Sequence, residues 1–351
     1  MAPPPEGRLY HGVFPGGATG PEYGEEDDLS LGEIQAYEKI VGQKVAWVYF
    51  SNNWYRSRAF PRQTATLIRE TGAVPFVRLM LRPSPEQANP AAMKKNPSTL
   101  QAIVDGRFDD DLKAWGRAAR DFGSPLIVEF GTEVNGQWFC WNGRWNGAGR
   151  TDGYGDPRKP DGPERFVAAF RHMVKIMRHE GADNISWVFH VNADDDPSAK
   201  WNRFENYYPG DDVVDWVGVS AYGAQTPKDK YEPQSLRDML DAAYPRILAM
   251  APQKPVMLLE FGCTRGHPKV RPEAWAGAAL DDLLGARWPK LRGFSWWNER
   301  WQNDDDPAHD TTMRVQDIPA LAEVFRSRLS TFGSRLQTRP SLITDEARGF
   351  N

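Results

Sequence analysis

The chain has 351 residues, 40% of them hydrophobic, with a formal net charge of -4. This is enough apolar sequence for a sizeable core. Acidic and basic residues are interspersed, which argues against nucleic acid or an anionic membrane surface as a partner. No apolar run of about 18 residues occurs, so no transmembrane helix is expected. The numbered sequence begins Met-Ala-Pro-Pro-Pro, without a charged leader and apolar segment, so we expect no signal peptide within it.

Apolar runs and helical periodicity alternate along the chain. Helical patterns occupy residues 61–70, 108–122, 164–179, 235–250, 272–284 and 318–329. Eight runs predict buried strands, at residues 10–14, 44–50, 73–81, 126–132, 185–191, 213–219, 256–261 and 291–297. This alternation predicts an α/β fold with a parallel sheet, and eight repeats favour a single closed (β/α)8 TIM barrel.

The barrel is expected to occupy residues 1–336, and residues 337–351, which lack periodicity, are predicted to form an irregular C-terminal tail. An open dinucleotide-binding sheet is disfavoured. The Pro-Gly-Gly-Ala-Thr-Gly turn after the first strand is not followed at once by a helix with a strong apolar face.

Two of the predicted strands end in an acid. The fourth strand leads into Glu133, and the seventh closes on Glu260 within a Glu-Phe-Gly sequence that echoes the one at Glu129. Burial without a nearby cation raises the pKa of a glutamate, which suits a group that delivers a proton near neutral pH. Two acids at the carboxyl ends of barrel strands are what glycoside hydrolysis by a pair of carboxylates requires. A solvated or salt-bridged strand-end acid is the plainer interpretation of each residue alone.

Tryptophan is abundant, with 14 residues in the chain. Some of these, such as Trp115 and Trp187, lie within apolar patterns typical of core filler. The others stand in presumed loops near acids, where an aromatic ring can stack on the apolar face of a sugar; they include Trp138, Trp141, Trp145, Trp201 and Trp301.

No motif predicts a metal, a cofactor or a serine nucleophile. The acidic stretches at residues 192–196 and 303–306 lack the spacing of an EF-hand and are interpreted as solvated loops. His190, at the end of the fifth strand, either lines the site or is a satisfied strand-end histidine, and no histidine has metal-ligand spacing to acids. No Gly-x-Ser-x-Gly elbow occurs. Pairing of Cys140 with Cys263 cannot be inferred from sequence.

Four motifs in order resemble those of glycoside hydrolase family 26, a family of (β/α)8 retaining glycosidases. Glu133-Val-Asn135-Gly136-Gln-Trp138-Phe139 resembles its acid/base motif, and Leu259-Glu260-Phe261-Gly262 its nucleophile motif. The stretches at residues 208–222 and 293–298 resemble its sixth and eighth strands. Together the similar segments cover most of residues 105–300.

The resemblance implies a double displacement in which Glu133 is the acid/base and Glu260 the nucleophile. It implies that Tyr222 hydrogen-bonds Glu260 and that Trp138 and Trp296 line the subsite where the bond breaks. Asn135, within the acid/base motif, is expected to bind the substrate, and Asp215 is expected to support the site. The plainer alternatives are that Tyr222 caps the sixth strand and that Asp215 is a loop cap.

Two positions depart from the family pattern. Mannan-cleaving members usually carry His directly before the acid/base and a basic residue four positions before it, whereas this chain has Thr132 and Glu129. By strand alternation Glu129 would share a face with Glu133. It would then raise the proton affinity of Glu133, or pair inside the barrel with a base such as Arg78. The residue before the acid/base normally touches the hydroxyl at C2 of the cleaved sugar, so Thr132 bears on mannose specificity.

The expected function is therefore an endo-acting retaining glycosidase, with β-1,4-mannan as the first substrate. Mixed-linkage β-1,3-1,4-glucan and β-1,3-xylan are the alternatives, and a non-catalytic sugar-binding barrel is the alternative of a different class. The expected partner is a polysaccharide or oligosaccharide, the expected state a monomer, and the expected location extracellular because such polymers do not enter cells.

Overall fold

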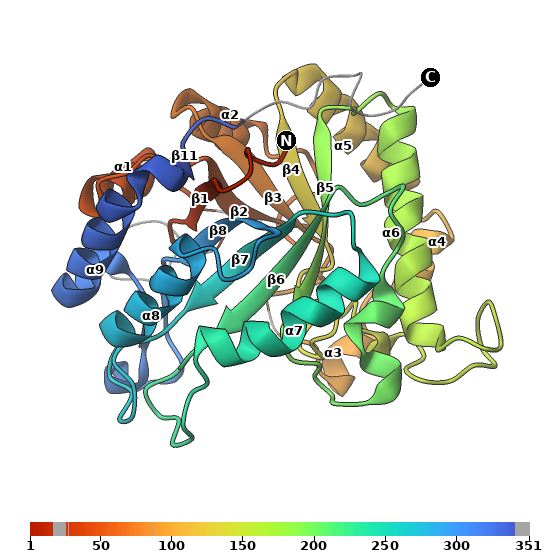
Figure 1. Cartoon of the computed structure of the whole chain (residues 1–351). Coiled ribbons are helices and arrows are strands. Elements are labelled where there is room, and N and C mark those ends of the chain that lie inside the picture. The colour runs from red at the N-terminus through yellow and green to blue at the C-terminus, as the bar shows by residue number, and fades with distance from the viewer. Residues whose placement is uncertain (17–25, 27, 86, 341–351) are drawn as a thin grey trace.

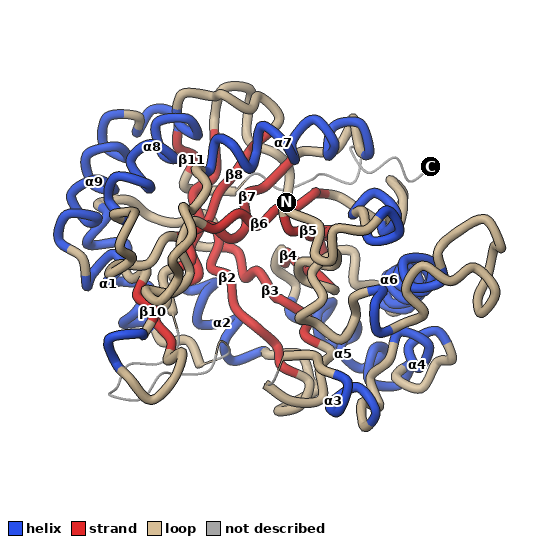
Figure 2. Tube along the Cα trace, turned by 90° about the horizontal axis from the view of Figure 1, so that it is seen from below, coloured by secondary structure: helices blue, strands red, loops and turns tan. Residues whose placement is uncertain are grey.

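A computed structural model describes residues 1–16, 26, 28–85 and 87–340 of the chain. Within this part, eight parallel strands form one closed ring in which β1 pairs with both β2 and β8. Helices surround the ring (Figures 1 and 2). The prediction of a single (β/α)8 barrel is therefore confirmed. The eight strands are β1 (Leu9–Phe14), β2 (Trp47–Asn53), β3 (Val74–Met80), β4 (Leu126–Phe130), β5 (Ile185–Asn192), β6 (Trp216–Tyr222), β7 (Val256–Gly262) and β8 (Leu291–Trp297).

The outer layer contains every helix that periodicity predicted and three that it missed. The missed helices are α1 (Leu31–Val41), α3 (Pro90–Lys94) and α4 (Leu100–Val104). The last two are too short to show a clear period. The others are α2 (Arg62–Glu70), α5 (Asp109–Phe122), α6 (Asp161–His179), α7 (Leu236–Met250), α8 (Pro272–Leu284) and α9 (Pro319–Thr331). Between β5 and β6 the described chain forms only two 3-10 turns, Lys200–Asn202 and Phe204–Tyr207.

Two strands lie about three residues further along the chain than predicted. The second was expected at residues 44–50 and the sixth at 213–219, but β2 ends at Asn53 and β6 ends at Tyr222. The residues missed at the end of β2 are polar, yet Ser51, Asn52 and Asn53 are all buried. Polar residues at the carboxyl ends of barrel strands face the mouth, so an apolar pattern underestimates how far each strand extends.

The end of the barrel sequence adds a short strand at the outer edge. Leu336–Gln337 form β11, which pairs in parallel with β1, so the first residue of the predicted tail belongs to the sheet. Residues 341–351 of that tail lie outside the described part of the chain. The division of the chain at residue 336 stays a prediction.

Among the helices of the described residues, none combines the length and the apolar character needed to cross a lipid bilayer. Cys140 and Cys263 are both buried and unpaired.

Candidate active site

Glu133 lies in the turn that follows β4, and the strand ends two residues earlier than the predicted range of 126–132. β4 ends at Phe130, and Gly131 turns the chain with a φ of 77°. Glu133 itself has a φ of 48°, a conformation that costs a non-glycine residue free energy and that the surroundings must hold in place. Strand alternation therefore does not continue to Glu133, and the argument that it shares a strand face with Glu129 was wrong.

Two donors fix the carboxylate of Glu133 once the turn has placed it. Trp138 Nε1 donates to Oε2 at 2.8 Å, and Asn192 Nδ2, at the end of β5, donates to Oε1 at 2.9 Å. Both are neutral donors, and the side chain lies next to a half-buried tryptophan ring. Glu133 is thus held in a defined orientation at the mouth of the barrel.

Glu260 lies on β7 at a bulge. Val219 pairs with Leu258 but Ser220 pairs with Glu260, so Leu259 has no partner on β6. A bulge of this kind re-aims the side chains that follow it, and such bulges are common beside active sites. Tyr222 Oη donates to Glu260 Oε2 at 3.0 Å, which is the hydrogen bond expected from the family resemblance.

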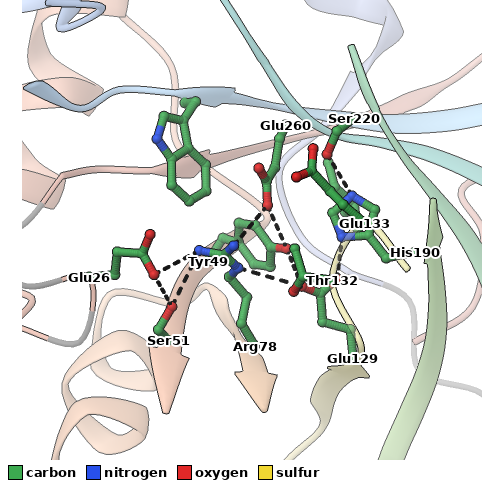
Figure 3. Close-up of polar contacts among 12 residues, drawn as sticks. Glu26, Tyr49, Ser51, Arg78, Glu129, Thr132, Glu133, His190, Ser220 and Glu260 are labelled. Atoms are coloured by element: carbon green, nitrogen blue, oxygen red, sulfur yellow. Dashed lines mark hydrogen bonds and ion pairs between the residues drawn. The ribbon is translucent and has the colours of Figure 1, made fainter. Parts of the chain in front are cut away.

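Arg78 is the buried cation of the site. Its guanidinium comes from β3 and reaches three carboxylates: Glu26 Oε2 at 3.0 Å, Glu260 Oε1 at 3.4 Å and Glu129 Oε1 at 3.6 Å. The ring of Trp297 lies against it, with the guanidinium carbon 4.9 Å from the ring centroid. Figure 3 shows the side chains of Glu26, Glu129 and Glu260 gathered around Arg78. Of the two outcomes considered for Glu129, the ion pair with Arg78 is the one observed.

Glu129 sits on β4 directly beside Arg78 in the sheet register and is completely buried. Its Oε1 accepts hydrogen bonds from Tyr49 Oη and, at 2.5 Å, from Thr132 Oγ1. Its Oε2 lies 2.8 Å from His190 Nδ1. The hydroxyl of Thr132, only 1% exposed, is thereby committed to Glu129. His190 is both a satisfied strand-end histidine and part of the floor beneath the two glutamates, so the two alternatives for it do not exclude each other.

The pKa values of the floor follow from burial and neighbouring charge. Burial opposes the charge of Glu129, but His190 and Arg78 outweigh it and lower the pKa of Glu129 below its ordinary value. Burial likewise opposes a charge on His190, yet Glu129, with Glu260 and Glu133 further off, raises its pKa. Burial raises the pKa of Glu260 to about 7; Arg78 acts against this rise, and the charge of Glu133 adds to it. Glu133 and Glu260 therefore share one electrostatic environment.

Two of the predicted site residues, Trp296 and Asp215, do not face the mouth. Trp296 packs outward against Phe261 and Phe325, and its Nε1 donates to Met313 O. Its predicted place in the cleavage subsite was wrong by one residue, because the neighbouring Trp297 is the inward ring. Asp215 lies before β6, where its Oδ2 accepts the backbone N–H of Trp187 near the start of β5. It is at the opposite end of the barrel, so the loop-cap alternative is correct.

Asn135 has no free polar atom for a substrate. It is fully buried; its Oδ1 accepts from Asn192 N, and its Nδ2 donates to Asn192 O, Asp194 O and Asp195 Oδ1. Its assignment as a substrate-binding residue was wrong, and its contacts instead tie the loop carrying Glu133 to the end of β5. Asp195 also pairs with Arg246 at 2.8 Å, so the first acidic stretch is not simply solvated.

The loop tryptophans divide in a similar way. Trp141 is buried and donates to Thr132 O, so it supports the turn from inside and does not present a sugar-binding face. Trp138 is half-buried beside Glu133, and three others expected in loops are half-buried as well: Trp145, Trp201 and Trp301.

His190 has no acid at metal-ligand spacing in the sequence, but in the structure it lies close to two glutamates. Ligand atoms of Glu129, His190 and Glu260 all lie within 4.8 Å of one another, a cluster whose donor set would suit a divalent cation. Tyr49 and Arg78, however, already bond to both carboxylates, and the guanidinium supplies the positive charge that a cation would bring. The cluster therefore fits a polar floor better than a metal centre.

Several residues that shape this site were not predicted from the sequence to be site residues. Tyr49 and Trp297 were absorbed into strand patterns, Asn192 was placed in the acidic stretch at residues 192–196, and Arg78 entered only as a candidate partner for Glu129. Arg78 did carry a signal, since it is a lone charged residue within the apolar run Val-Pro-Phe-Val-Arg-Leu-Met of β3. A buried charge needs a partner, so such a residue points toward an acid in the barrel.

Several known glycoside hydrolases are similar to this chain in sequence. Residues 87–250 match the model of glycosyl hydrolase family 26. Endoglucanase H of Acetivibrio thermocellus is 24% identical over 303 residues, which are 86% of this chain but 29% of that protein. A β-1,3-xylanase, TXYA of Vibrio sp., is 31% identical over 127 residues, 36% of this chain and 23% of its own. A mannan endo-1,4-β-mannosidase of Bacillus subtilis is 24% identical over 184 residues, 51% of this chain and 40% of its own.

Solved structures show the same fold at low identity. A GH26 β-mannanase from Bacteroides ovatus superposes with a TM-score of 0.59 at 14% identity, covering 95% of this chain and 90% of the other. The YdhT protein from Bacillus subtilis gives 0.57 at 19% identity, covering 84% and 81%. This chain thus spans less than a third of the length of Endoglucanase H and of TXYA, while it spans most of these barrels. The family-model match over residues 87–250 and the sequence relatives show that this chain is similar to members of glycoside hydrolase family 26.

Proposed function

We propose that the chain is a retaining, endo-acting glycoside hydrolase in which Glu133 is the acid/base and Glu260 the nucleophile. The observation that supports the proposal is that the two glutamates flank one site. Glu133 follows β4, Glu260 lies on β7, and the charge of Glu133 acts on the pKa of Glu260 across the mouth. Two carboxylates flanking one site are what double displacement at a glycosidic bond requires.

The contacts of the two glutamates suit different tasks. Within the described part of the chain, Glu133 accepts hydrogen bonds from the neutral groups of Trp138 and Asn192, which leaves its proton to pass to the leaving oxygen. Glu260 meets a guanidinium and a phenol, which favour its ionised form as it attacks the anomeric carbon. A glycosyl ester forms at Glu260 as the glycosidic bond breaks. Glu133 then removes a proton from water, which cleaves the ester and frees Glu260.

β-1,4-Mannan is the first substrate that we propose, since the relatives include mannan endo-1,4-β-mannosidases. Mixed-linkage β-glucan is the second. It is favoured by the extent of the match to Endoglucanase H and by Thr132, whose hydroxyl is occupied by Glu129 and so is not free to contact a sugar hydroxyl at C2. β-1,3-Xylan is the third, from the shorter match to TXYA. Half-buried tryptophans in the segments that follow β4, β5 and β8 support binding of a chain in an open groove, hence internal cleavage.

A polysaccharide panel tests the proposal. Mannan, mixed-linkage glucan and β-1,3-xylan are incubated with the wild type, Glu133→Ala and Glu260→Ala, and reducing ends and product lengths are followed. Glu323→Ala, an exposed substitution on α9, is the matched control. We expect oligosaccharides of mixed length from the wild type and the control, and loss of release in both site variants. If all four proteins bind a polysaccharide but release nothing, the chain is a sugar-binding barrel. Release of only one mono- or disaccharide from the start would refute endo action.

The remaining proposals concern location and assembly. Because polysaccharides of this kind do not enter cells, we propose that the chain acts outside the cell. We further propose that it acts as a monomer, which size-exclusion chromatography with light scattering tests.

A further inference from the structure

The buried pair of Glu129 and His190 lies beneath the candidate nucleophile Glu260, whose own polar contacts include Arg78, Tyr222 and Tyr49. Both side chains are completely buried, one on β4 and one on β5. His190 Nδ1 lies 2.8 Å from Glu129 Oε2, and His190 Nε2 lies 2.7 Å from Ser220 Oγ on β6. The pair therefore links three neighbouring strands under the mouth (Figure 3).

Glu129 competes with Glu260 for the same positive charge. The Arg78 guanidinium approaches Glu129 with Nε at 3.6 Å and Glu260 with Nη2 at 3.4 Å. Tyr49 Oη also contacts both carboxylates, donating to Glu129 Oε1 and lying 3.3 Å from Glu260 Oε1. A buried carboxylate without its own cation would draw the guanidinium toward itself and repel the charge of its neighbour.

We propose that His190 is a positioning residue that neutralises Glu129, so that Arg78 stays available to the carboxylate of Glu260. This inference rests on the proposed function, in which Glu260 must be ionised to attack. A positively charged His190 and a negatively charged Glu129 add no net charge to the floor. The pair can therefore hold Tyr49 and Thr132 in place through Glu129 without opposing the ionisation of Glu260.

The charged and titratable groups around Glu260 agree with this assignment. Arg78 and His190 act to lower its pKa, whereas Glu133 and Glu129 act to raise it. The phenols that contact Glu260 are those of Tyr49 on β2 and Tyr222 on β6, and burial raises both of their pKa values well above the ordinary value. They stay neutral at the relevant pH. Glu299, after β8, is also buried near this group: burial raises its pKa well above the ordinary value, and the charges of Glu26 and Glu260 add to the rise.

The pair predicts different results for single and double substitution. His190→Asn leaves the Glu129 carboxylate without its own cation beside Glu260, so the pKa of Glu260 should rise by about one unit or more, as expected for loss of an opposite charge nearby. Glu129→Gln together with His190→Asn removes both charges, and the pKa of Glu260 should return toward its wild-type value. A residue with only a structural role would make the double variant at least as impaired as the single one.

The experiment reads Glu260 directly and does not depend on turnover. The protein is labelled with ¹³C at glutamate carboxyl carbons, the signal of Glu260 is assigned with Glu260→Gln, and its titration is followed in the wild type and in both variants. His172→Asn is the matched control, since His172 pairs with Asp109 at 2.7 Å on the outer helices. Circular dichroism and thermal unfolding check that each variant is folded.

An upward shift in His190→Asn, reversed in the double variant and absent in the control, supports the proposal. An unchanged pKa of Glu260 in His190→Asn, or an equal rise in the double variant, overturns it. Failure of the proposed function would appear elsewhere, as absence of hydrolysis by the wild type, while this titration could still succeed. If His190→Asn fails to fold, His190→Gln, which can still donate a hydrogen bond but carries no charge, is titrated under the same criteria.

Discussion

Arg78 on β3 meets Glu260 on β7 across the inside of the barrel, with Nη2 3.4 Å from Oε1. Each of the two groups offsets part of the free-energy cost of burying the other, because an unpaired buried charge is costly. Arg78 is shared with two more acids, so Glu260 receives only part of its charge. This sharing explains why burial, despite the guanidinium, still raises the pKa of Glu260 to about 7.

The pH dependence of activity should reflect this raised pKa. A nucleophile must be ionised, so the free enzyme loses its active form as the pH falls through the pKa of Glu260. We expect kcat/KM to decline about tenfold for each unit below pH 7. The measurement is a pH profile of kcat/KM on a soluble substrate, after controls for stability at each pH. An acid limb near pH 4.5, the ordinary range of a glutamate, would contradict the expectation.

Tyr222→Phe should slow the reaction and leave substrate binding nearly intact. The phenol donates to Glu260 Oε2 at 3.0 Å, and a hydrogen bond to a charged group contributes about 1.5–3 kcal/mol. That corresponds to a fall of roughly 10- to 100-fold in kcat. Steady-state kinetics measure it. Tyr208→Phe is the control, because its phenol contacts Asp211 at an exposed site. Equal effects of both substitutions would argue against a role for Tyr222 at Glu260.

Glu133→Ala should separate the two halves of the reaction. With a poor leaving group, loss of the acid should slow cleavage by about 10²- to 10⁴-fold. An aryl glycoside whose leaving group needs no protonation should still form the glycosyl ester, and azide should then replace water and yield a β-glycosyl azide. The measurement is azide-dependent turnover with product analysis by NMR. Glu260→Ala, treated in the same way, should give no β-product, and formation of one would contradict the assigned roles.

Gly131→Ala should destabilise the barrel strongly. Gly131 has a φ of 77°, and an added Cβ would lie 2.3 Å from Phe166 Cε2. Gly123 offers the matched control, since it has a similar φ of 69° but no atom within 4 Å of an added Cβ. Gly123→Ala should cost about 1–2 kcal/mol from the backbone alone. Gly131→Ala should cost about 1–3 kcal/mol more. Thermal unfolding compares the two, and equal losses would show that the clash is relieved.

The barrel could be predicted because its signals are local. Each strand is a short apolar run, most of the helices have clear periodicity, and their alternation allows few topologies. The sequence was less informative where a single residue changes direction. Gly131 ends β4 early, so strand alternation misplaced Glu133 relative to Glu129, and a bulge at Leu259 re-aims β7.

The sequence also did not reveal which way a side chain points or how far it lies from the mouth of the barrel. Trp296 and Trp297 are adjacent, and only the packing of Trp296 against α8 and α9 shows that Trp297 is the inward ring. Asp215 stands next to β6 in sequence, yet at the end of the barrel away from Glu260. The network around Arg78 joins β2, β3, β4, β5 and β7, and contacts of such separation leave no spacing that a sequence pattern could reveal.

The central claim is that Glu260 forms a covalent bond to the sugar while Glu133 manages the proton. Incubation of Glu133→Ala with an activated aryl glycoside should let the ester form faster than water removes it. Mass spectrometry of the digested protein should then show one added glycosyl group on the peptide containing Glu260. A label on another acid, such as Glu129 or Glu299, or hydrolysis of the glycoside with no label at all, would contradict the account.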